Sequence, residues 1–227
     1  MTLRMIALFD LDGTLTDPKA GITRSIQYAL DKLGQNVPDA EALTWMIGPP
    51  LIASFAKLLG GPEDAQEALR LYRERFSVTG LFENEVYAGI PALLQHLQEK
   101  GVRLFVATSK PHVYARRILD HFELSRFFVE IYGSELDNRN ADKRDLIRYI
   151  LGQERFDPAH AVMIGDREHD AIGAKANGLA SIGVTWGYGT REELLAAGVS
   201  CLVDAPQALA EPILTLTAPR PRRAAAP

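Results

Sequence analysis

The sequence predicts an α/β protein: a three-layer, doubly wound parallel sheet with a Rossmann-like core and an inserted all-helical cap domain. First, strand-like and helix-like segments alternate from about residue 86 onward, which is the pattern of parallel sheets. Second, the stretch 16–85 carries helical patterns and no convincing strand. Third, acidic, hydroxyl or glycine residues follow several apolar runs, as expected where ligands bind at strand ends.

The first strand is the apolar run that ends at Phe9. It is followed by Asp10, Asp12 and Gly13. Residues two apart in an extended backbone point to the same side, so the two aspartates are expected to project together. Carboxylates this close repel each other unless a cation or a shared proton relieves them. The alternative is an ordinary strand-to-turn junction, where aspartate and glycine are common.

Four helices are expected after this strand. Asp17 and Pro18 form an N-cap and a first helical position, and Gly34 ends the first helix. Gly48 and the two prolines that follow it separate the second helix from the third. The expected helices cover residues 18–33, 39–45, 51–59 and 62–78.

The second half of the chain supplies the remaining strands and helices. Strands are expected at 102–107, 127–132, 161–164, 180–185 and 199–203, and helices at 89–100, 112–122, 142–151 and 169–177. Residues 108–111 are expected as a loop. This division assigns 1–15 and 86–217 to the core domain, 16–85 to the helical cap domain, and the Arg/Pro/Ala-rich 218–227 to a disordered tail.

Composition excludes several classes of function. The chain has 227 residues and a net charge of −4, so it carries no footprint of nucleic-acid or membrane binding. No run is long enough to span a bilayer, and no signal-peptide cleavage region follows the N-terminal apolar run. The single cysteine, Cys201, is expected as a small buried hydrophobe. We expect a cytoplasmic protein, a monomer or homodimer, that binds a small molecule.

The residues with chemical potential gather at one edge of the predicted sheet. The carboxyl ends of parallel strands share an edge, which brings Asp10 and Asp12 near Asp166. Asp170 lies four residues after Asp166 at a helix start and faces the same way. Four clustered carboxylates need a cation, and their oxygens suit Mg²⁺, which usually meets phosphate oxygens as well. Lys143 would oppose them as a fixed positive charge.

Thr108 and Lys143 offer the hydroxyl and the ammonium that a phosphoryl group requires. Taken alone, each also has an ordinary interpretation. Thr108 can cap the next helix, and Lys143 can belong to a solvated, charged helix start. Asp170 can likewise be an acidic residue that meets a helix dipole.

Four segments carry a family resemblance: 10–14 (DLDGT), 106–111 (VATSKP), Lys143 and 164–170 (IGDREHD). In this order and spacing they resemble the motifs of the haloacid dehalogenase-like hydrolase superfamily. The resemblance covers nearly the whole chain except the tail. It is closest to the phosphoglycolate phosphatase-like branch, in which a helical cap is inserted after the first motif.

The resemblance implies an Mg²⁺-dependent phosphatase that works through an aspartyl-phosphate. Asp10 resembles the nucleophile, and Asp12 resembles the general acid that later acts as a base. The metal would be held by Asp10, the backbone carbonyl of Asp12, and Asp166. Asp170 would be a further ligand or would orient a metal-bound water.

The resemblance also implies which residues bind the phosphoryl group. Thr108 and Lys143 would contact its oxygens, with Lys143 also neutralising Asp10. Ser109 and the backbone N–H groups around Gly13 and Thr14 would complete the substrate-binding set.

Other activities of the superfamily fit the sequence less well. Asp12 favours a phosphatase over the dehalogenases, which do not need an acid/base aspartate at this position. The cap stretch from Ile47 to Ser54 is apolar and has no arginine, which argues against a phosphosugar mutase. Retention of all the motif acids argues against a catalytically silent phosphate binder.

Two small phosphomonoesters fit the sequence as substrates. The low charge of the Gly48 loop fits phosphoglycolate, which is the first expectation. It also fits a nucleoside 5′-monophosphate, the substrate of a 5′-nucleotidase, whose base would stack on Trp45, Phe55 or Tyr72.

Two further features are interpreted without a catalytic role. Lys110 is expected to touch the substrate or to cap a helix. The sequence Gly187-Tyr188-Gly189 lacks the third glycine of a dinucleotide motif and is interpreted as an ordinary loop.

Overall fold

The computed structural model describes residues 5–218, and its centre is a six-stranded sheet in the order β5-β4-β1-β6-β7-β8. Every neighbouring pair is parallel, as predicted. The tail predicted at 218–227 lies, except for Ala218, outside the described residues. The strands are β1 (Ile6–Phe9), β4 (Arg103–Pro111), β5 (Glu130–Ser134), β6 (Ala161–Gly165), β7 (Ala180–Val184) and β8 (Cys201–Val203).

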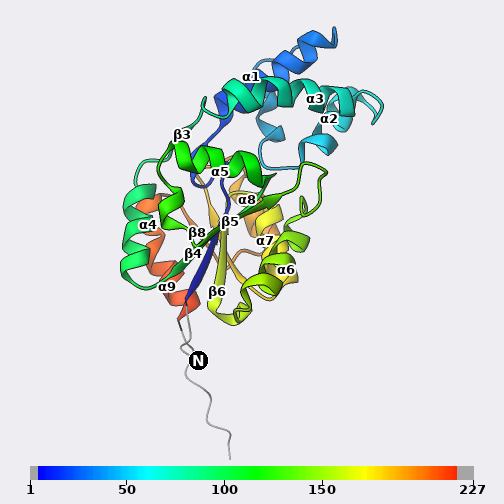
Figure 1. Ribbon diagram of the computed structural model, residues 1–227. Helices are drawn as coiled ribbons and strands as arrows, with labels where there is room; N and C mark the ends of the chain where they lie inside the picture. Colours follow the sequence, from blue (N-terminus) through cyan, green and yellow to red (C-terminus); the bar gives the residue numbers. More distant parts are fainter. Residues whose placement is uncertain (1–4, 219–227) are drawn as a thin grey trace, which may run out of the picture.

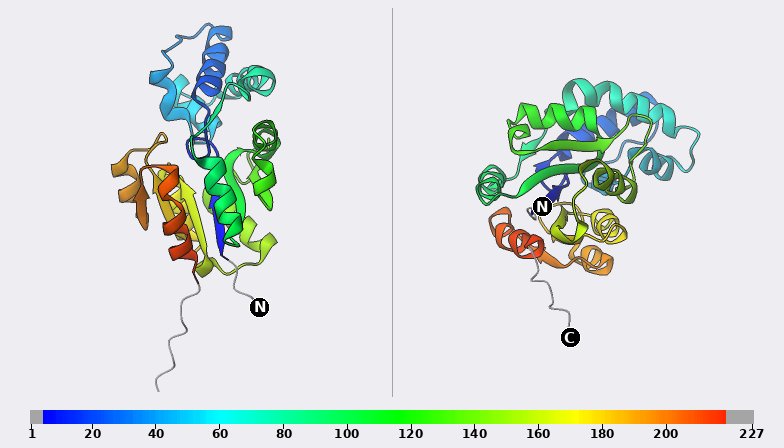
Figure 2. Two further views of the ribbon diagram at one scale, coloured as in Figure 1. Left: turned by 90° about the vertical axis from the view of Figure 1, so that its left-hand side faces the viewer. Right: turned by 60° about the horizontal axis from the view of Figure 1, so that its bottom comes forward.

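Side-chain alternation along β1 produces the three layers. Ile6 and Leu8 belong to one buried cluster, and Ala7 and Phe9 belong to the other, because successive side chains of a strand point to opposite faces. Figures 1 and 2 show helices on both faces of the sheet. The Phe9 face is covered by α4 (Ile90–Glu99), α5 (His112–His121) and α9 (Ala210–Thr217), and the other by α6 (Lys143–Glu154), α7 (Glu168–Ala176) and α8 (Arg191–Ala197).

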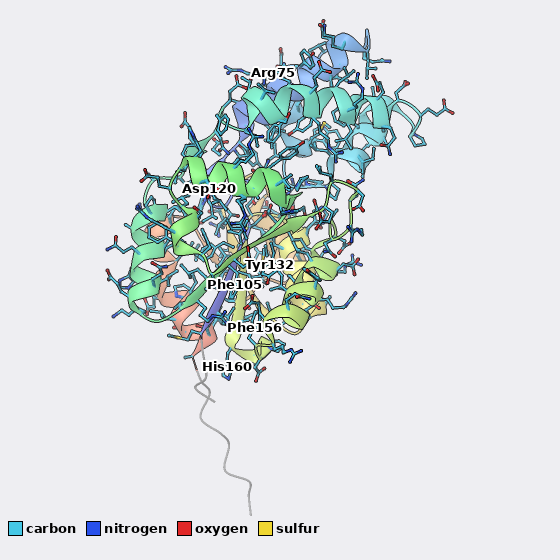
Figure 3. The ribbon with its side chains drawn as sticks, in the orientation of Figure 1. Arg75, Phe105, Asp120, Tyr132, Phe156 and His160 are labelled. Atoms are coloured by element: carbon cyan, nitrogen blue, oxygen red, sulfur yellow. The ribbon has the colours of Figure 1, made fainter. Side chains whose placement is uncertain are left out.

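Aromatic side chains anchor α6 to the sheet. The ring of Phe105 in β4 lies 6.3 Å from Tyr132 and 6.1 Å from Phe156, and Figure 3 shows the three side chains together. The Tyr132 hydroxyl donates to Glu154 at 2.8 Å, and Arg103 pairs with the same carboxylate at 2.9 Å. Burial of these rings stabilises the packing by about 25 cal/mol per Å² of apolar surface. It thereby fixes the helix whose first residue is Lys143.

The inserted helices form a separate block at the carboxyl edge of the sheet, in blue to teal in Figure 1. We call this block the cap. Arg75, labelled in Figure 3, joins its parts, since it pairs with Glu83 at 2.7 Å and donates to Ser25 at 3.2 Å. Its elements are α1 (Lys19–Lys32), a 3₁₀-helix (Glu41–Met46), α2 (Leu51–Leu59), α3 (Ala65–Arg75) and a π-helical turn (Phe76–Gly80).

A short hinge connects the cap to the core. β2 (Thr16–Asp17) and β3 (Glu85–Val86) form an antiparallel pair through which the chain enters and leaves the cap. The expectation of no strand between residues 16 and 85 is therefore wrong at both ends. Two-residue strands are too short to show the alternation that identifies a strand in sequence.

Several boundaries also differ from prediction. β4 runs to Pro111 instead of ending at residue 107, because Thr108 and Pro111 still pair with β5 across a shift in register. β5 starts at Glu130, since residues 125–127 form a 3₁₀ turn. The short helices α8 and α9 were not predicted, and Cys201 is only partly buried. Within residues 5–218, no helix has the length and apolar character needed to cross a membrane.

Candidate active site

Three carboxylates and one ammonium meet at the end of β1. Asp10 follows this strand directly, and Asp10, Asp166 and Asp170 each place one oxygen within 4.8 Å of the others. The Lys143 ammonium lies 2.9 Å from Asp10 Oδ1 and 2.5 Å from Asp170 Oδ1. It also donates to the carbonyl of Ala107 at 2.7 Å. All four charged side chains are buried, so three of the four predicted carboxylates meet Lys143 here, while the Asp12 side chain pairs with Lys110 instead.

Asp170 is fixed from two sides. The backbone N–H of Arg167 donates to its Oδ2 at 3.2 Å, while Lys143 holds Oδ1. The first of these contacts is the helix-start role that the sequence allowed as an alternative, since Asp170 lies in the first turn of α7. The structure therefore shows the contact at the helix start and, in the same side chain, the ion pair with Lys143.

Asp12 faces a different partner from Asp10. Its Oδ2 lies 2.7 Å from the ammonium of Lys110, and its Oδ1 is buried without a hydrogen-bond partner among the described residues. Lys110 is also buried and stands 4.5 Å from the ring centroid of Phe76, which belongs to the cap. Asp12 is thus held by one oxygen and keeps the other unpaired.

Gly13 and Thr14 pack on Asp166. Gly13 has φ of +82°, and a Cβ atom there would lie 2.3 Å from Asp166 Oδ2, so only glycine fits. The Thr14 hydroxyl donates to Asp166 Oδ1 at 3.3 Å. The backbone N–H of Tyr188 donates to the other oxygen of Asp166 at 2.8 Å.

Thr108 lies within β4 and not in the loop that was expected after it. The pairing of Phe9 with Val106 brings this part of β4 alongside Asp10. The Thr108 hydroxyl oxygen accepts the N–H of Lys110 at 3.2 Å. Ser109 is half-buried and lines the cleft described below.

Burial and mutual repulsion control the charges of the cluster. Burial, assisted by the charges of Asp10 and Asp170, raises the pKa of Asp166 to about 8. Burial also raises the pKa values of Asp12 and Asp170, against the opposing effects of Lys110 and Lys143 respectively. Burial disfavours the ammonium of Lys143, but Asp10 and Asp170 together raise its pKa above the usual value. Four carboxyl groups thus face two ammonium groups, and without a cation the excess is relieved by a proton that Asp166 keeps at neutral pH.

These residues fit a hard divalent cation. Asp10, Asp166 and Asp170 offer only oxygen ligands, and all three side chains are buried. Buried carboxylates of this kind are costly unless a cation compensates them. Oxygen ligands of this type suit Mg²⁺ or Ca²⁺ and not the softer transition metals.

A narrow cleft separates the cluster from the cap. The cleft is partly open and offers a cavity of about 60 Å³. Its core side carries Asp12, Ser109 and Lys110, and its cap side carries Tyr72 and Phe76. A water needs about 10–15 Å³, so this space holds a few waters and is too small for a nucleotide.

The cleft is lined by a different set of aromatic residues from the one that the sequence indicated. Tyr72 and Phe76 stack at 5.0 Å, and Tyr114 of α5 meets Phe76 edge-on at 5.8 Å. Of the three predicted stacking residues, only Tyr72 lines the cavity. Phe55 is fully buried behind it, and Trp45 packs against Lys57.

Three functional contacts were missed or left open in the sequence. Lys110 lies two residues after Thr108, and the alternation of an extended strand would have placed both on one side had β4 been drawn to its full length. Trp186 donates from Nε1 to the carbonyl of Thr14 at 3.2 Å, and Tyr188 binds Asp166 through its backbone. The two aromatic residues carry no local signal, because their partners are distant in sequence.

Fold and site together define the class of protein. A family model described as haloacid dehalogenase-like hydrolase matches residues 7–184. The chain belongs to this family. The match spans the first strand, the cap and the sheet as far as the end of β7.

Individual proteins also resemble the chain over most of its length. A 5′-nucleotidase from Pseudomonas aeruginosa is 54% identical over 190 residues, which cover 83% of this chain and 86% of the relative. Phosphoglycolate phosphatase 1 from the same organism is 26% identical over 211 residues, covering 89% and 77% respectively. The crystal structure of a protein described as a predicted phosphatase from Clostridium acetobutylicum has a TM-score of 0.91 at 46% identity, covering 95% of this chain and all of that one.

One relative is named as a kinase and not as a phosphatase. Tyrosine-protein kinase PtkA from Mycobacterium tuberculosis is 42% identical over 184 residues, which cover 81% of this chain. The aligned region is 63% of PtkA, so the chain spans less than two thirds of that relative.

Proposed function

We propose that this protein is an Mg²⁺-dependent phosphatase that hydrolyses small phosphomonoesters through an aspartyl-phosphate on Asp10. The enzyme is a phosphoric monoester hydrolase of the haloacid dehalogenase-like superfamily. The observation that supports the proposal most is the meeting of Asp10 with Lys143, Asp166 and Asp170 in one buried cluster. This cluster pairs a nucleophile with the Lys143 ammonium and with two carboxylates that would hold a cation, and these positive charges would neutralise a phosphoryl group.

The reaction has two chemical steps, in which Asp10 and Asp12 have different roles. Asp10 attacks phosphorus, and an Asp10 Oδ–P bond forms while the bond from phosphorus to the leaving oxygen breaks. Asp12 donates a proton to the leaving oxygen and then accepts one from the water that hydrolyses the aspartyl-phosphate. The unpaired Oδ1 of Asp12 is the oxygen that is available for these transfers.

Positioning and charge supply the rest of the catalysis. The Thr108 hydroxyl and the Lys143 ammonium bind phosphoryl oxygens, with Ser109 beside them. The backbone N–H groups of Gly13 and Thr14, which were expected in this set, donate instead to the carbonyls of Thr16 and Leu11. Asp10, Asp166, the carbonyl of Asp12 and, directly or through water, Asp170 would hold Mg²⁺. When bound, Mg²⁺ neutralises the carboxylates and polarises the phosphoryl oxygens.

The cap, with boundaries 16–85, is proposed to select the substrate and exclude water by opening and closing at the hinge. The small size of the cavity between cap and core supports this role, because a nucleotide needs more room than this arrangement offers. The helical block forms most of the apolar wall opposite Asp12 and Lys110.

A nucleoside 5′-monophosphate is the substrate that we now place first. The sequence alone favoured phosphoglycolate, but the 5′-nucleotidase relative is 54% identical and the phosphoglycolate phosphatase relative 26%. The aromatic residues Tyr72, Phe76 and Tyr114 offer a base the faces and edges that phosphoglycolate does not need. Phosphoglycolate is the second candidate.

A substrate comparison tests this order. Tyr114→Leu should raise KM for nucleoside 5′-monophosphates by about 10-fold, because base stacking contributes roughly 1–3 kcal/mol, and should leave KM for phosphoglycolate unchanged. Steady-state phosphate release with both substrates measures the effect. Tyr149→Phe on the exposed side of α6 is the control. Higher kcat/KM for phosphoglycolate in the wild type, with no substrate-dependent effect of Tyr114→Leu, would reverse the order of the two candidates.

A thermal experiment tests the metal site. The pKa of Asp166 is about 8 in the folded protein, against an ordinary value of 3.8. At a pH between these two values, the metal-free folded protein keeps a proton on Asp166, whereas the unfolded chain has released it. Metal-free stability should therefore fall as pH rises through this range. Mg²⁺ favours the ionised carboxylate, so it should raise Tm more at about pH 8 than at about pH 6.

An asparagine variant provides the control for this experiment, and the wild type provides a measurement of activity. Asp166→Asn should remove most of the difference between the two pH values, and chelation of the wild type should stop turnover until Mg²⁺ is returned. An equal Mg²⁺ effect at both pH values would contradict the assignment of Asp166, and turnover that survives chelation would contradict the metal requirement.

A further inference from the structure

The loop after β7, residues 185–189, lies between the metal-site carboxylate Asp166 and the hinge of the cap. Tyr188 touches both. Its backbone N–H donates to Asp166 Oδ2 at 2.8 Å, and its hydroxyl donates to the carboxylate of Asp17 in hinge strand β2. We call residues 185–189 the hinge-contact loop.

Asp17 connects this loop to the cap itself. The Asp17 Oδ1 that accepts the Tyr188 hydroxyl also accepts the N–H of Lys19, the first residue of α1, at 3.0 Å. The Tyr188 hydroxyl is therefore bonded to the group that starts the first cap helix. Burial and the contact with Asp17 raise the pKa of Tyr188, so its hydroxyl keeps its proton and remains a donor at neutral pH.

A second contact in the loop follows a parallel route. Trp186 donates from Nε1 to the carbonyl of Thr14 at 3.2 Å, and its ring lies 6.4 Å from that of Tyr87, the residue after hinge strand β3. The hydroxyl of Thr14 donates to Asp166. Both strands of the hinge are thus linked to Asp166 through residues in or beside this loop.

The two glycines of the loop allow this close approach. A Cβ on Gly187 would lie 2.4 Å from Asp166 Oδ2, and one on Gly189 would lie 2.0 Å from the Asp166 carbonyl oxygen. Any larger residue would push the loop away from Asp166. The Gly187-Tyr188-Gly189 sequence is therefore explained by contact with Asp166, with Tyr188 reaching across to the hinge.

From these contacts we propose that Tyr188 is a positioning residue that couples cap closure to the geometry of the metal site. With the hinge closed, Asp17 holds the Tyr188 hydroxyl, and the Tyr188 N–H holds Asp166 Oδ2. A hinge movement that displaces Asp17 releases the hydroxyl and loosens the donor to Asp166. The inference rests on the proposed metal role of Asp166. By thermodynamic linkage, Mg²⁺ binding then raises the closed-to-open ratio of the cap by the same factor by which cap closure raises the affinity for Mg²⁺.

Fluorescence energy transfer between cap and core tests the coupling without using turnover. The dyes are attached at Asp31→Cys in the cap and Gln153→Cys in α6, both exposed, in a Cys201→Ser background. The closed-to-open ratio is measured without Mg²⁺ and at saturating Mg²⁺, and calorimetry gives the Mg²⁺ dissociation constant. We expect Mg²⁺ to raise this ratio at least about fivefold in the labelled wild type and less than about twofold in Tyr188→Phe.

Two further variants sharpen the measurement. Asp17→Asn keeps an oxygen acceptor but removes the charge, so it should give an intermediate value, and combined with Tyr188→Phe it should cause no further loss. Asp17→Asn also carries the test if Tyr188→Phe fails to fold. Tyr149→Phe removes a hydroxyl from an exposed tyrosine and should match the labelled wild type.

The outcomes separate the coupling from the metal site. If Mg²⁺ binds the wild type but does not shift the cap, or shifts it equally in Tyr188→Phe and Asp17→Asn, the coupling is wrong while the metal site stands. If calorimetry shows no Mg²⁺ binding to the wild type, the metal role of Asp166 fails, and the coupling falls with it.

Discussion

Replacement of Asp10 by asparagine is expected to lower turnover by about 10⁴-fold or more, the size of loss seen when a catalytic nucleophile is removed. Asparagine has nearly the same shape but does not act as a carboxylate nucleophile. The fold should persist, because Lys143 keeps its contacts with Asp170 and with the carbonyl of Ala107. One carboxylate fewer also reduces the repulsion inside the cluster. Steady-state phosphate release and thermal melting measure the two effects.

A matched variant separates the nucleophile from a general loss of charge. Asp120→Asn removes an exposed aspartate on α5, seen on the outer side of the core in Figure 3. It should retain wild-type turnover and Tm. Substantial turnover by Asp10→Asn would exclude Asp10 as the nucleophile.

Replacement of Lys143 by methionine is expected to damage stability and activity together. The ammonium is buried between Asp10 and Asp170. Removal of one partner of a buried ion pair costs about 3–5 kcal/mol of unfolding free energy, because it leaves uncompensated charge. Loss of a donor to the transferring phosphoryl group should lower turnover by about 10²–10³-fold. Denaturant unfolding and phosphate release provide the two numbers.

Mg²⁺ should distinguish the two effects of this substitution. Bound Mg²⁺ compensates the carboxylates, so it should recover part of the lost stability but not the lost turnover. Lys175→Met, on the exposed side of α7, is the control and should change neither quantity. Wild-type stability of Lys143→Met in the absence of Mg²⁺ would show that the ammonium does not balance the cluster.

The acidic core of the site could be predicted because its residues follow strands of one parallel sheet. Asp10 and Asp166 each follow a buried apolar run, and such runs are recognisable in a single sequence. Parallel pairing then brings them together at one edge. Lys143 was harder to place, because it begins α6 after a loop that follows β5, and without the family resemblance it could equally belong to a solvated, charged helix start.

The connections between cap and core could not be predicted in this way. Tyr188 meets Asp17 across 171 positions, and Arg167 donates to the carbonyl of Ile47 across 120. Neither contact has a periodicity or a spacing that sequence patterns record. Lys110 was left without a fixed role because β4 was drawn too short, which removed the alternation that places it beside Thr108. The hinge strands were missed for the simpler reason that each has two residues.

The aromatic lining of the cleft shows the same limit on predicting a substrate. Helical spacing identifies Tyr72 and Phe76 as apolar positions of one helical segment, but does not say which of them faces the core domain. Folding buries Phe55 behind Tyr72 and brings in Tyr114 from α5. The substrate preference is therefore a property of the assembled cleft.

Trapping of the phosphorylated enzyme tests the role of Asp10 most directly. The wild type is mixed with a radiolabelled phosphomonoester and Mg²⁺, quenched in acid during the first turnover, and digested for peptide mapping. We expect label on the peptide that contains Asp10, in a bond cleaved by hydroxylamine as acyl phosphates are, and none in Asp10→Asn. Label on another residue, or rapid phosphate release with no labelled peptide at any time before the first turnover ends, would contradict an aspartyl-phosphate at Asp10.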